Sequence, residues 1–291
     1  MRCIRRHKYT EVSKSMSIKE IACDLANRFR RAHDLGMYCG KTIVNIVDKL
    51  SIGEAKQIKL IRRPFNSERL AGFIAYKHDT FIIVTNTNKT VGNERFTVAH
   101  EIYHLLENLQ DIMDKRLLEE LVHTEGESIN NGMEKMANYF AAELLMPSED
   151  VKYEFERLSS RRKDKSDISI VINLQQLYGV DYIAMVKRLA ELELITAEKD
   201  IKSLEEAAEN MEELMNITLR LGFDNEVNTE SKVHYISNQY LDMLRTNYEN
   251  KLTDYNDLAV IFDYLGCEPE RFGYTRYNEQ SEEARDFISD L

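Results

Sequence analysis

The stretch RFTVAHEIYHLLEN, residues 95–108, decides how this sequence is interpreted. The segment 93–109 around it has helical period, and Asn93 is a suitable N-cap residue. On such a helix the apolar side chains gather on one side, while His100 and His104 fall together on the opposite side. Two imidazoles one turn apart can bind one zinc ion, and Glu101 beside them can reach a water on it. The pattern predicts metal ligands at His100 and His104 and a general base at Glu101.

A catalytic zinc ion usually has three protein ligands and an open position for water. The helix predicted over 133–146 offers two carboxylates. Glu134 shares its face with small residues that let another helix approach, and Asn138, one turn on, would support a ligand by hydrogen bonding. Glu143 shares its face with bulkier side chains. We therefore expect Glu134 to be the third ligand, with Glu143 or His123 as the alternatives.

The remaining sequence predicts a mostly helical chain with a few strands. Helices are expected over 17–35, 42–50 and 115–121, and strands over 57–61, 72–76 and 81–85, the last two as a hairpin. Two short helices within 168–195 flank Gly179-Val180-Asp181, which is helix-turn-helix spacing. Residues 201–291 are acidic and helical.

The composition of the 291 residues is that of a folded protein, with 43% hydrophobic residues. No apolar run approaches the roughly 18 residues of a membrane span. The four cysteines are widely spaced without a CxxC pair, so neither a disulfide framework nor a thiolate zinc site is expected. The sequence thus predicts no membrane partner and a cytoplasmic location.

Charge is divided unevenly along the chain. Residues 1–90 contain 18 Lys+Arg and 8 Asp+Glu, whereas the remainder contains 21 and 42. A basic front could contact nucleic acid or an acidic partner. Complementary halves of one fold would show the same asymmetry, and this second interpretation is favoured.

The segments RFTVAHEIYHLLEN and EKMANYFAAELLMP together resemble the ImmA/IrrE family of metallopeptidases. The resemblance extends upstream through the hairpin and downstream through LQQLYGVDYIAMVKRLAELELI, over roughly 17–200. It implies a thermolysin-like arrangement with one Zn²⁺ per chain, His100, His104 and Glu134 as ligands, and Glu101 as general base. Family members are similar in cutting a specific helix-turn-helix repressor.

The expected fold class is α+β and mostly α-helical. We expect a polar tail at 1–16, a zincin-like metallopeptidase domain with a small β-sheet at 17–160, and a helix-turn-helix-like segment at 161–200. An acidic helical domain at 201–291 would then be available to recognise the substrate, because its charge suits a basic, DNA-binding protein.

Tyr103 departs from the family pattern, which commonly has Gly before the second His. Packing against a neighbouring element is the favoured explanation; narrowing of the substrate channel and contact with the oxyanion are the others. A second group commonly stabilises the oxyanion in such sites. Tyr103, His123, Tyr139 and His78 are the candidates, and the sequence does not separate them.

The expected function is therefore zinc-dependent endopeptidase, with a helix-turn-helix repressor of phage, mobile-element or stress-response genes as substrate. The alternative is a regulator that binds DNA or protein and keeps zinc without proteolysis. Against it, the second helix of the helix-turn-helix-like segment has only Lys187 and Arg188 for phosphate or base contacts. Loss of catalytic function is disfavoured, because all four catalytic positions hold competent residues.

Overall fold

The computed structural model describes residues 16–52, 56–67, 69–77, 80–107, 131–160, 167–236, 238–264 and 267–275. It divides into two compact units, Met1–Val233 and His234–Leu291. The boundary that the sequence suggested at 201 does not coincide with this division. The helix expected over 115–121 lies outside the described residues.

The first unit contains a small mixed sheet. Its strands are β1 (Ser51–Ile52), β2 (Lys56–Arg63), β3 (Gly72–Lys77) and β4 (Thr80–Asn86), in the order β1-β2-β4-β3. β3 and β4 form the predicted antiparallel hairpin, while β2 pairs with β4 in parallel. Alternate apolar residues of β2 and β4, and one apolar residue of β3, are buried, so one face of the sheet supplies the core. These buried residues are Ile58, Leu60, Ile74, Phe81 and Ile83.

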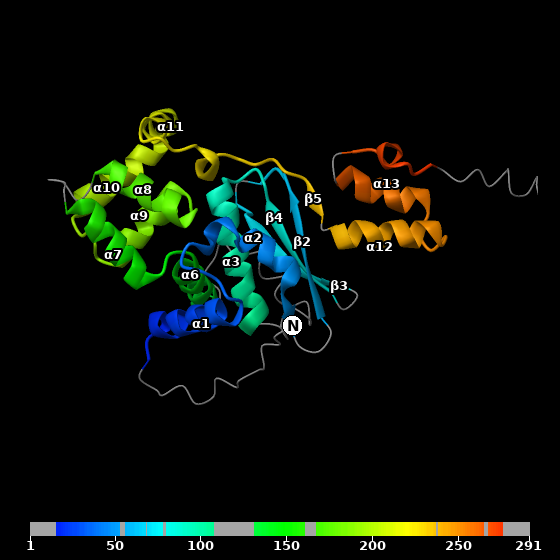
Figure 1. Ribbon diagram of the computed structural model, residues 1–291, viewed down its shortest axis with the longest axis horizontal. Coiled ribbons are helices and arrows are strands. Elements are labelled where there is room, and N and C mark those ends of the chain that lie inside the picture. The colour runs from blue at the N-terminus through cyan, green and yellow to red at the C-terminus, as the bar shows by residue number, and fades with distance from the viewer. Residues whose placement is uncertain are drawn as a thin grey trace, which may run out of the picture. The chain divides into compact units, whose positions relative to one another are not determined.

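One helix packs against this sheet, and two further helices follow behind it. α3 (Val91–Glu107) contacts β3 and β4, and α6 (Asn131–Leu145) packs against both α3 and α1 (Ile18–Ala32), as Figure 1 shows. α1 begins with a capping box between Ser17 and Glu20. The segment predicted as one helix over 42–50 is instead α2 (Ile43–Ile46) between 3₁₀ turns at Cys39–Lys41 and Val47–Lys49.

The start of α3 differs from the prediction. Asn93 lies inside the helix, and its backbone N–H donates to Thr90 Oγ1 at 3.1 Å. Thr90 therefore caps the helix three residues earlier than the sequence suggested. Asn93 and Thr90 are both good capping residues, so propensity alone could not choose between them.

The helix-turn-helix spacing is confirmed by α8 (Ile168–Tyr178) and α9 (Tyr182–Glu191). Gly179 takes the left-handed conformation, φ +71°, which ends α8, and Asp181 caps α9. α7 (Ser148–Ser159) packs against α8, α10 (Glu198–Glu209) against α9, and α11 (Met211–Arg220) against α8. A 3₁₀ turn at Glu226–Asn228 follows.

The second unit is a small helical hairpin. It consists of α12 (Asn238–Glu249), α13 (Tyr255–Tyr264) and a 3₁₀ turn at Pro269–Phe272, after the short strand β5 (Tyr235–Ile236). Its core contains Leu244, Tyr248, Leu258 and Phe262. Other apolar side chains stay exposed, as with Leu252 and Val260.

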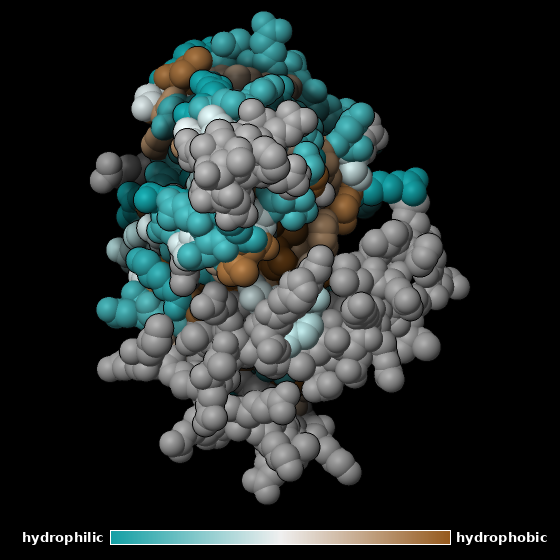
Figure 2. All heavy atoms as spheres, turned by 90° about the vertical axis from the view of Figure 1, so that its right-hand side faces the viewer, coloured by the Kyte–Doolittle hydropathy of each residue, from teal (hydrophilic) through white to brown (hydrophobic). Residues whose placement is uncertain are grey.

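Described residues on the face displayed in Figure 2 are mostly hydrophilic, with apolar residues scattered between them. Among the described helices, none combines the length and apolar character that crossing a membrane requires. The α+β, mostly helical class expected from the sequence is confirmed.

Candidate metal centre

The predicted metal ligands lie together where α3 passes α6. His100 Nε2 and His104 Nε2 are 3.1 Å apart. Glu134, in the first turn of α6, places Oε2 3.2 Å from His100 Nε2 and Oε1 3.3 Å from His104 Nε2. Ligand atoms bound tetrahedrally at about 2.0–2.1 Å lie about 3.3–3.4 Å from each other. The three side chains therefore have the spacing that one tetrahedral metal ion requires.

Asn138 supports one of these imidazoles, as the sequence suggested. Its Oδ1 lies 3.0 Å from His100 Nδ1. A proton on Nδ1 would be donated to this amide oxygen, which leaves the lone pair of Nε2 directed toward the shared site. Glu134 and Asn138 lie four residues apart, so one face of α6 supplies both the carboxylate and the support.

Two buried carboxylate oxygens at this site make no hydrogen bond within the described part of the chain. They are Oε1 of Glu134 and Oε2 of Glu101. Buried polar atoms in folded proteins normally have a partner, so such atoms indicate a ligand or water. His100, His104 and Glu134 offer two nitrogens and an oxygen, a donor set that fits Zn²⁺.

Electrostatics couple these groups. Burial would raise the pKa of Glu134, but the hydrogen bond from His100 and the charges of both imidazoles hold it well below its usual range. Burial would likewise lower the pKa of His100, yet the carboxylates of Glu134 and Glu101 raise it above its ordinary value. A carboxylate ionised across the physiological range suits binding of a cation.

Glu101 is almost fully buried, with 3% of its surface exposed. Burial raises the pKa of Glu101 from its ordinary value, against the opposing influence of His100 and His104. A raised pKa brings a carboxylate closer to the range in which a general base works best. Glu101 lies within electrostatic reach of both histidines and of Glu134, as its predicted role requires.

The alternatives to Glu134 are not equally placed. Glu143 is buried and engaged by the guanidinium of Arg188 and by Ser148, so its carboxylate is occupied away from the two histidines. His123, the other alternative, lies outside the described residues. His78, one of the candidates for stabilising the oxyanion, also lies outside them. Of the two candidates that the structure describes, Glu134 and Glu143, Glu134 is the one that lies beside His100 and His104.

Tyr103 is buried, with its ring centroid 5.8 Å from Phe140 of α6 and 5.6 Å from His104. Burial raises the pKa of its hydroxyl. These contacts agree with packing between α3 and α6, the favoured explanation for its departure from the family pattern. Tyr139 has the Lys19 ammonium 5.2 Å from its ring centroid.

The start of α3 is held by close backbone contact with the α8–α9 turn. A Cβ on Gly92 would lie 2.1 Å from the Asp181 backbone nitrogen, so only glycine fits this contact. Arg95, one turn further along, donates from Nη1 to the Gly179 carbonyl at 3.2 Å and pairs with Glu226 at 2.7 Å. These contacts fix the helix that carries His100 and His104.

Residues 54–190 match the family model described as the IrrE N-terminal-like domain, which is a family of peptidases. The chain contains an IrrE N-terminal-like domain. The predicted resemblance to the ImmA/IrrE family is confirmed, and the IrrE-like domain includes every residue of the metal site. The match of residues 54–190 to a peptidase family model supports a metallopeptidase type of function.

Solved structures offer a weaker likeness. A Mycobacterium tuberculosis transcriptional regulator is similar at 18% sequence identity and a TM-score of 0.38, over 59% of this chain and 46% of the regulator. The chain thus spans less than half the length of that protein. None of the curated proteins compared with the chain matches it.

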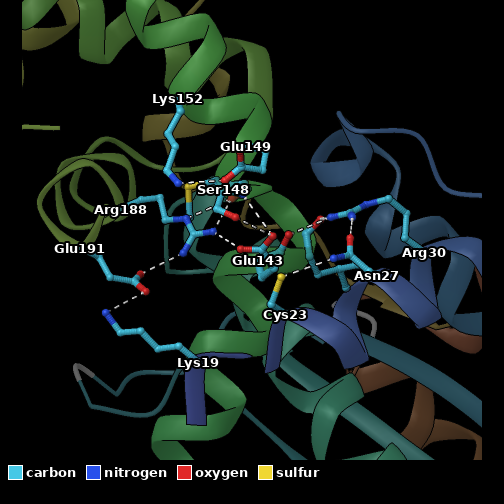
Figure 3. Close-up of polar contacts among 12 residues, drawn as sticks. Lys19, Cys23, Asn27, Arg30, Glu143, Ser148, Glu149, Lys152, Arg188 and Glu191 are labelled. Carbon is cyan, nitrogen blue, oxygen red and sulfur yellow. Dashed lines mark hydrogen bonds and ion pairs between the residues drawn. The ribbon is translucent and has the colours of Figure 1, made fainter. Parts of the chain in front are cut away.

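The sequence did not indicate a second polar cluster, which lies at the other end of α6 from the candidate metal site. Arg30 of α1 and Arg188 of α9 both bind the last turn of α6, with Glu143 between them (Figure 3). Their partners are 42 to 114 residues away in the chain, so no local pattern could have revealed these contacts.

Proposed function

We propose that this protein is a zinc-dependent endopeptidase. The observation that carries the proposal is the convergence of His100, His104 and Glu134 at separations of 3.1 to 3.3 Å. Two histidines and one glutamate are the ligand set of thermolysin-type catalytic zinc sites. Zn²⁺ as the metal, one ion per chain, is part of the proposal.

The chain's own residues then have distinct roles. When bound, Zn²⁺ supplies the Lewis acidity that makes water nucleophilic near neutral pH and polarises a peptide carbonyl. Glu101 takes the proton from the attacking water and later gives it to the leaving amine. Asn138 holds the His100 ring through Nδ1, and Glu134 contributes the negative charge that the cation needs.

An extended substrate can be held by an edge strand. The sequence suggested residues 81–85 as this edge strand or the strand next to it. These residues belong to β4, which lies next to the end strand β3. β3 ends the described order β1-β2-β4-β3 and lies against α3. We therefore place the substrate backbone along β3, Gly72–Lys77.

We propose a helix-turn-helix repressor as the substrate, cleaved in the cytoplasm. This rests on the family resemblance and on the acidic second half of the chain, which suits a basic DNA-binding partner. Residues 201–233 belong to the first compact unit, so the separate candidate for substrate recognition begins at His234. Unchanged repressor cleavage after deletion of 234–291 would rule out that role.

The DNA-binding alternative loses one of its two basic residues. Arg188 is 3% exposed, and its guanidinium binds Met146, Glu143 and Glu191 inside the protein. Lys187 is exposed and remains for a phosphate contact. A single lysine is too little for duplex binding by α9 alone, since affinity depends on several phosphate contacts.

The test is co-expression with helix-turn-helix regulators encoded near the gene, followed by mass spectrometry of the products. We expect the wild type to cut one regulator at a defined bond. Glu101→Gln should retain zinc and lose cleavage, because the amide keeps the shape of the carboxylate but cannot accept the proton. A zinc-loaded wild type that cuts no regulator and binds DNA tightly would favour the alternative.

A further inference from the structure

Two arginines from different helices bind the C-terminal end of α6. Arg30 of α1 donates from Nη2 to the carbonyls of Glu143 and Leu144, at 2.8 and 2.9 Å. Arg188 of α9 donates to the Met146 carbonyl from Nε at 3.0 Å and from Nη2 at 2.8 Å. The last carbonyls of a helix have no partner within it and carry its negative dipole end. Both arginines therefore donate hydrogen bonds to the free carbonyls at this end of α6 and balance the negative end of its dipole.

Glu143 completes the cluster. Its Oε2 forms an ion pair with Arg188, and its Oε1 accepts from Ser148 N at 3.1 Å and Ser148 Oγ at 3.2 Å. Glu191 accepts from Arg188 Nη1 at 3.1 Å. Arg188 and Glu143 are both buried, and Figure 3 shows the two guanidinium groups on either side of the Glu143 carboxylate.

The same helix carries the third metal ligand. Glu134 lies nine residues before Glu143, about 13–14 Å along the axis of a regular helix. Phe140, between these ends, packs against Phe29 and Tyr103 and restricts sideways movement of α6. The polar contacts at the C-terminal end of α6 fix the position of the helix along its axis and its rotation about that axis.

We propose that Arg188 is a positioning residue for the metal centre, acting through α6. By holding the end of this helix it sets the place of Glu134 and Asn138 relative to His100 and His104. The inference rests on the proposed metal site and deepens it. It gives the helix-turn-helix-like segment a role within the enzyme, because α9 supports the ligand helix.

Two variants separate this role from general stability. Arg188→Lys keeps a positive charge beside Glu143, but an ammonium lacks the planar fork that reaches Glu143, Met146 and Glu191 together. Arg188→Met removes the charge as well. The matched control is Tyr178→Phe. Tyr178 lies on α8, and its hydroxyl donates a 2.7 Å hydrogen bond to Asp150 of α7, so the variant loses this bond and leaves α6 untouched.

The first readout is Co²⁺ affinity, measured from visible absorption in competition with a chelator. We expect Arg188→Lys to weaken Co²⁺ binding at least tenfold, as loss of outer support at metal sites commonly does by about 10–100-fold. Its absorption bands should shift, because the coordination geometry changes. The Co²⁺ affinity of Tyr178→Phe should stay within about twofold of the wild-type affinity. This should hold even if the melting temperature of Tyr178→Phe falls as far as that of Arg188→Lys.

Hydrogen exchange of the metal-free protein is the second readout. In Arg188→Lys the amides of 131–145 should exchange faster than in Tyr178→Phe. Wild-type Co²⁺ affinity and wild-type exchange in Arg188→Lys would overturn the positioning role and leave the metal site intact. A wild type that binds no Co²⁺ would overturn the metal site itself, and the role with it. Should Arg188→Met fail to fold, Arg188→Lys still decides the question.

Discussion

Glu94 of α3 accepts two hydrogen bonds from the guanidinium of Arg62 on β2, Oε1 from Nε at 2.7 Å and Oε2 from Nη2 at 2.8 Å. Thr85 of β4 donates a third to Oε1, at 2.7 Å. Glu94 is 1% exposed, so its carboxylate is shielded from water in the ion pair with Arg62. These three hydrogen bonds tie the helix that carries His100 and His104 to two strands of the sheet.

Arg62→Met should therefore lower the free energy of unfolding by about 3–5 kcal/mol, because it leaves a buried carboxylate without its counter-charge. The double variant Arg62→Met/Glu94→Met should recover most of this loss, since it removes both charges. Urea unfolding of the two variants and the wild type measures the difference. A loss below about 1 kcal/mol in Arg62→Met would show that the pair does not fix α3.

Gly92 gives a second test of how α3 is held. Alanine there would place Cβ 2.1 Å from Asp181 N and 2.6 Å from Val180 C, both backbone atoms. We expect Gly92→Ala to destabilise the protein by at least about 1–3 kcal/mol, the usual effect of overpacking. Gly132→Ala is the matched control in α6, because among the described residues nothing beyond the adjacent helix backbone lies within 4 Å of the position its Cβ would take. The effect of this control should stay below about 1 kcal/mol. Equal effects of the two substitutions would contradict the close contact.

His33 should make stability depend on pH. Its ring lies against Phe29, with centroids 4.4 Å apart, and burial lowers its pKa. The unfolded state then binds the proton more tightly, so this contribution to stability is complete above about pH 6.5 and is lost as pH falls toward the folded value. In His33→Leu the loss of unfolding free energy between pH 7.5 and 5.5 should be smaller than in wild type, by urea unfolding with chelator present. An identical pH dependence in the variant would refute this.

Tyr103 tests whether the departure from the family pattern is a matter of packing. Tyr103→Phe should retain stability and peptidase activity, because it keeps the ring against Phe140 and loses only the hydroxyl. Tyr103→Gly should cost about 3–5 kcal/mol, the usual effect of emptying an aromatic site. Activity lost in Tyr103→Phe with unchanged thermal stability would instead assign the hydroxyl to the oxyanion.

The sequence could anticipate that His100, His104 and Glu134 lie together, because their placement depends on helical period. His100 and His104 share a face through local spacing, and the small residues around Glu134 marked the side of α6 that faces α3. The hairpin of β3 and β4 was equally local, with its short connection and β-branched strands. The parallel pairing of β2 with β4 was not predicted, because it depends on segments about 20 residues apart and leaves no periodic signal.

Arg188 shows what could not be predicted. On sequence it was one of two basic residues in a helix-turn-helix-like segment, and so a candidate for phosphate contact. In the structure it binds the end of α6, 42 residues earlier in the chain. An arginine at a protein surface and one that caps a buried helix look alike in sequence, since burial is set by tertiary packing. The choice between Thr90 and Asn93 as the cap of α3 was likewise decided by packing.

The central claim is that His100, His104 and Glu134 hold one catalytic metal ion, and Zn²⁺ titration of the metal-free protein tests it most directly. Isothermal calorimetry should show one ion bound per chain in wild type and in Glu101→Gln. In His104→Ala and Glu134→Ala zinc binding should be lost or weakened by at least about 100-fold. Loss of a metal ligand lowers metal affinity more than loss of a residue that supports a ligand, which lowers it by about 10–100-fold. Wild-type zinc affinity in both ligand variants would contradict the site.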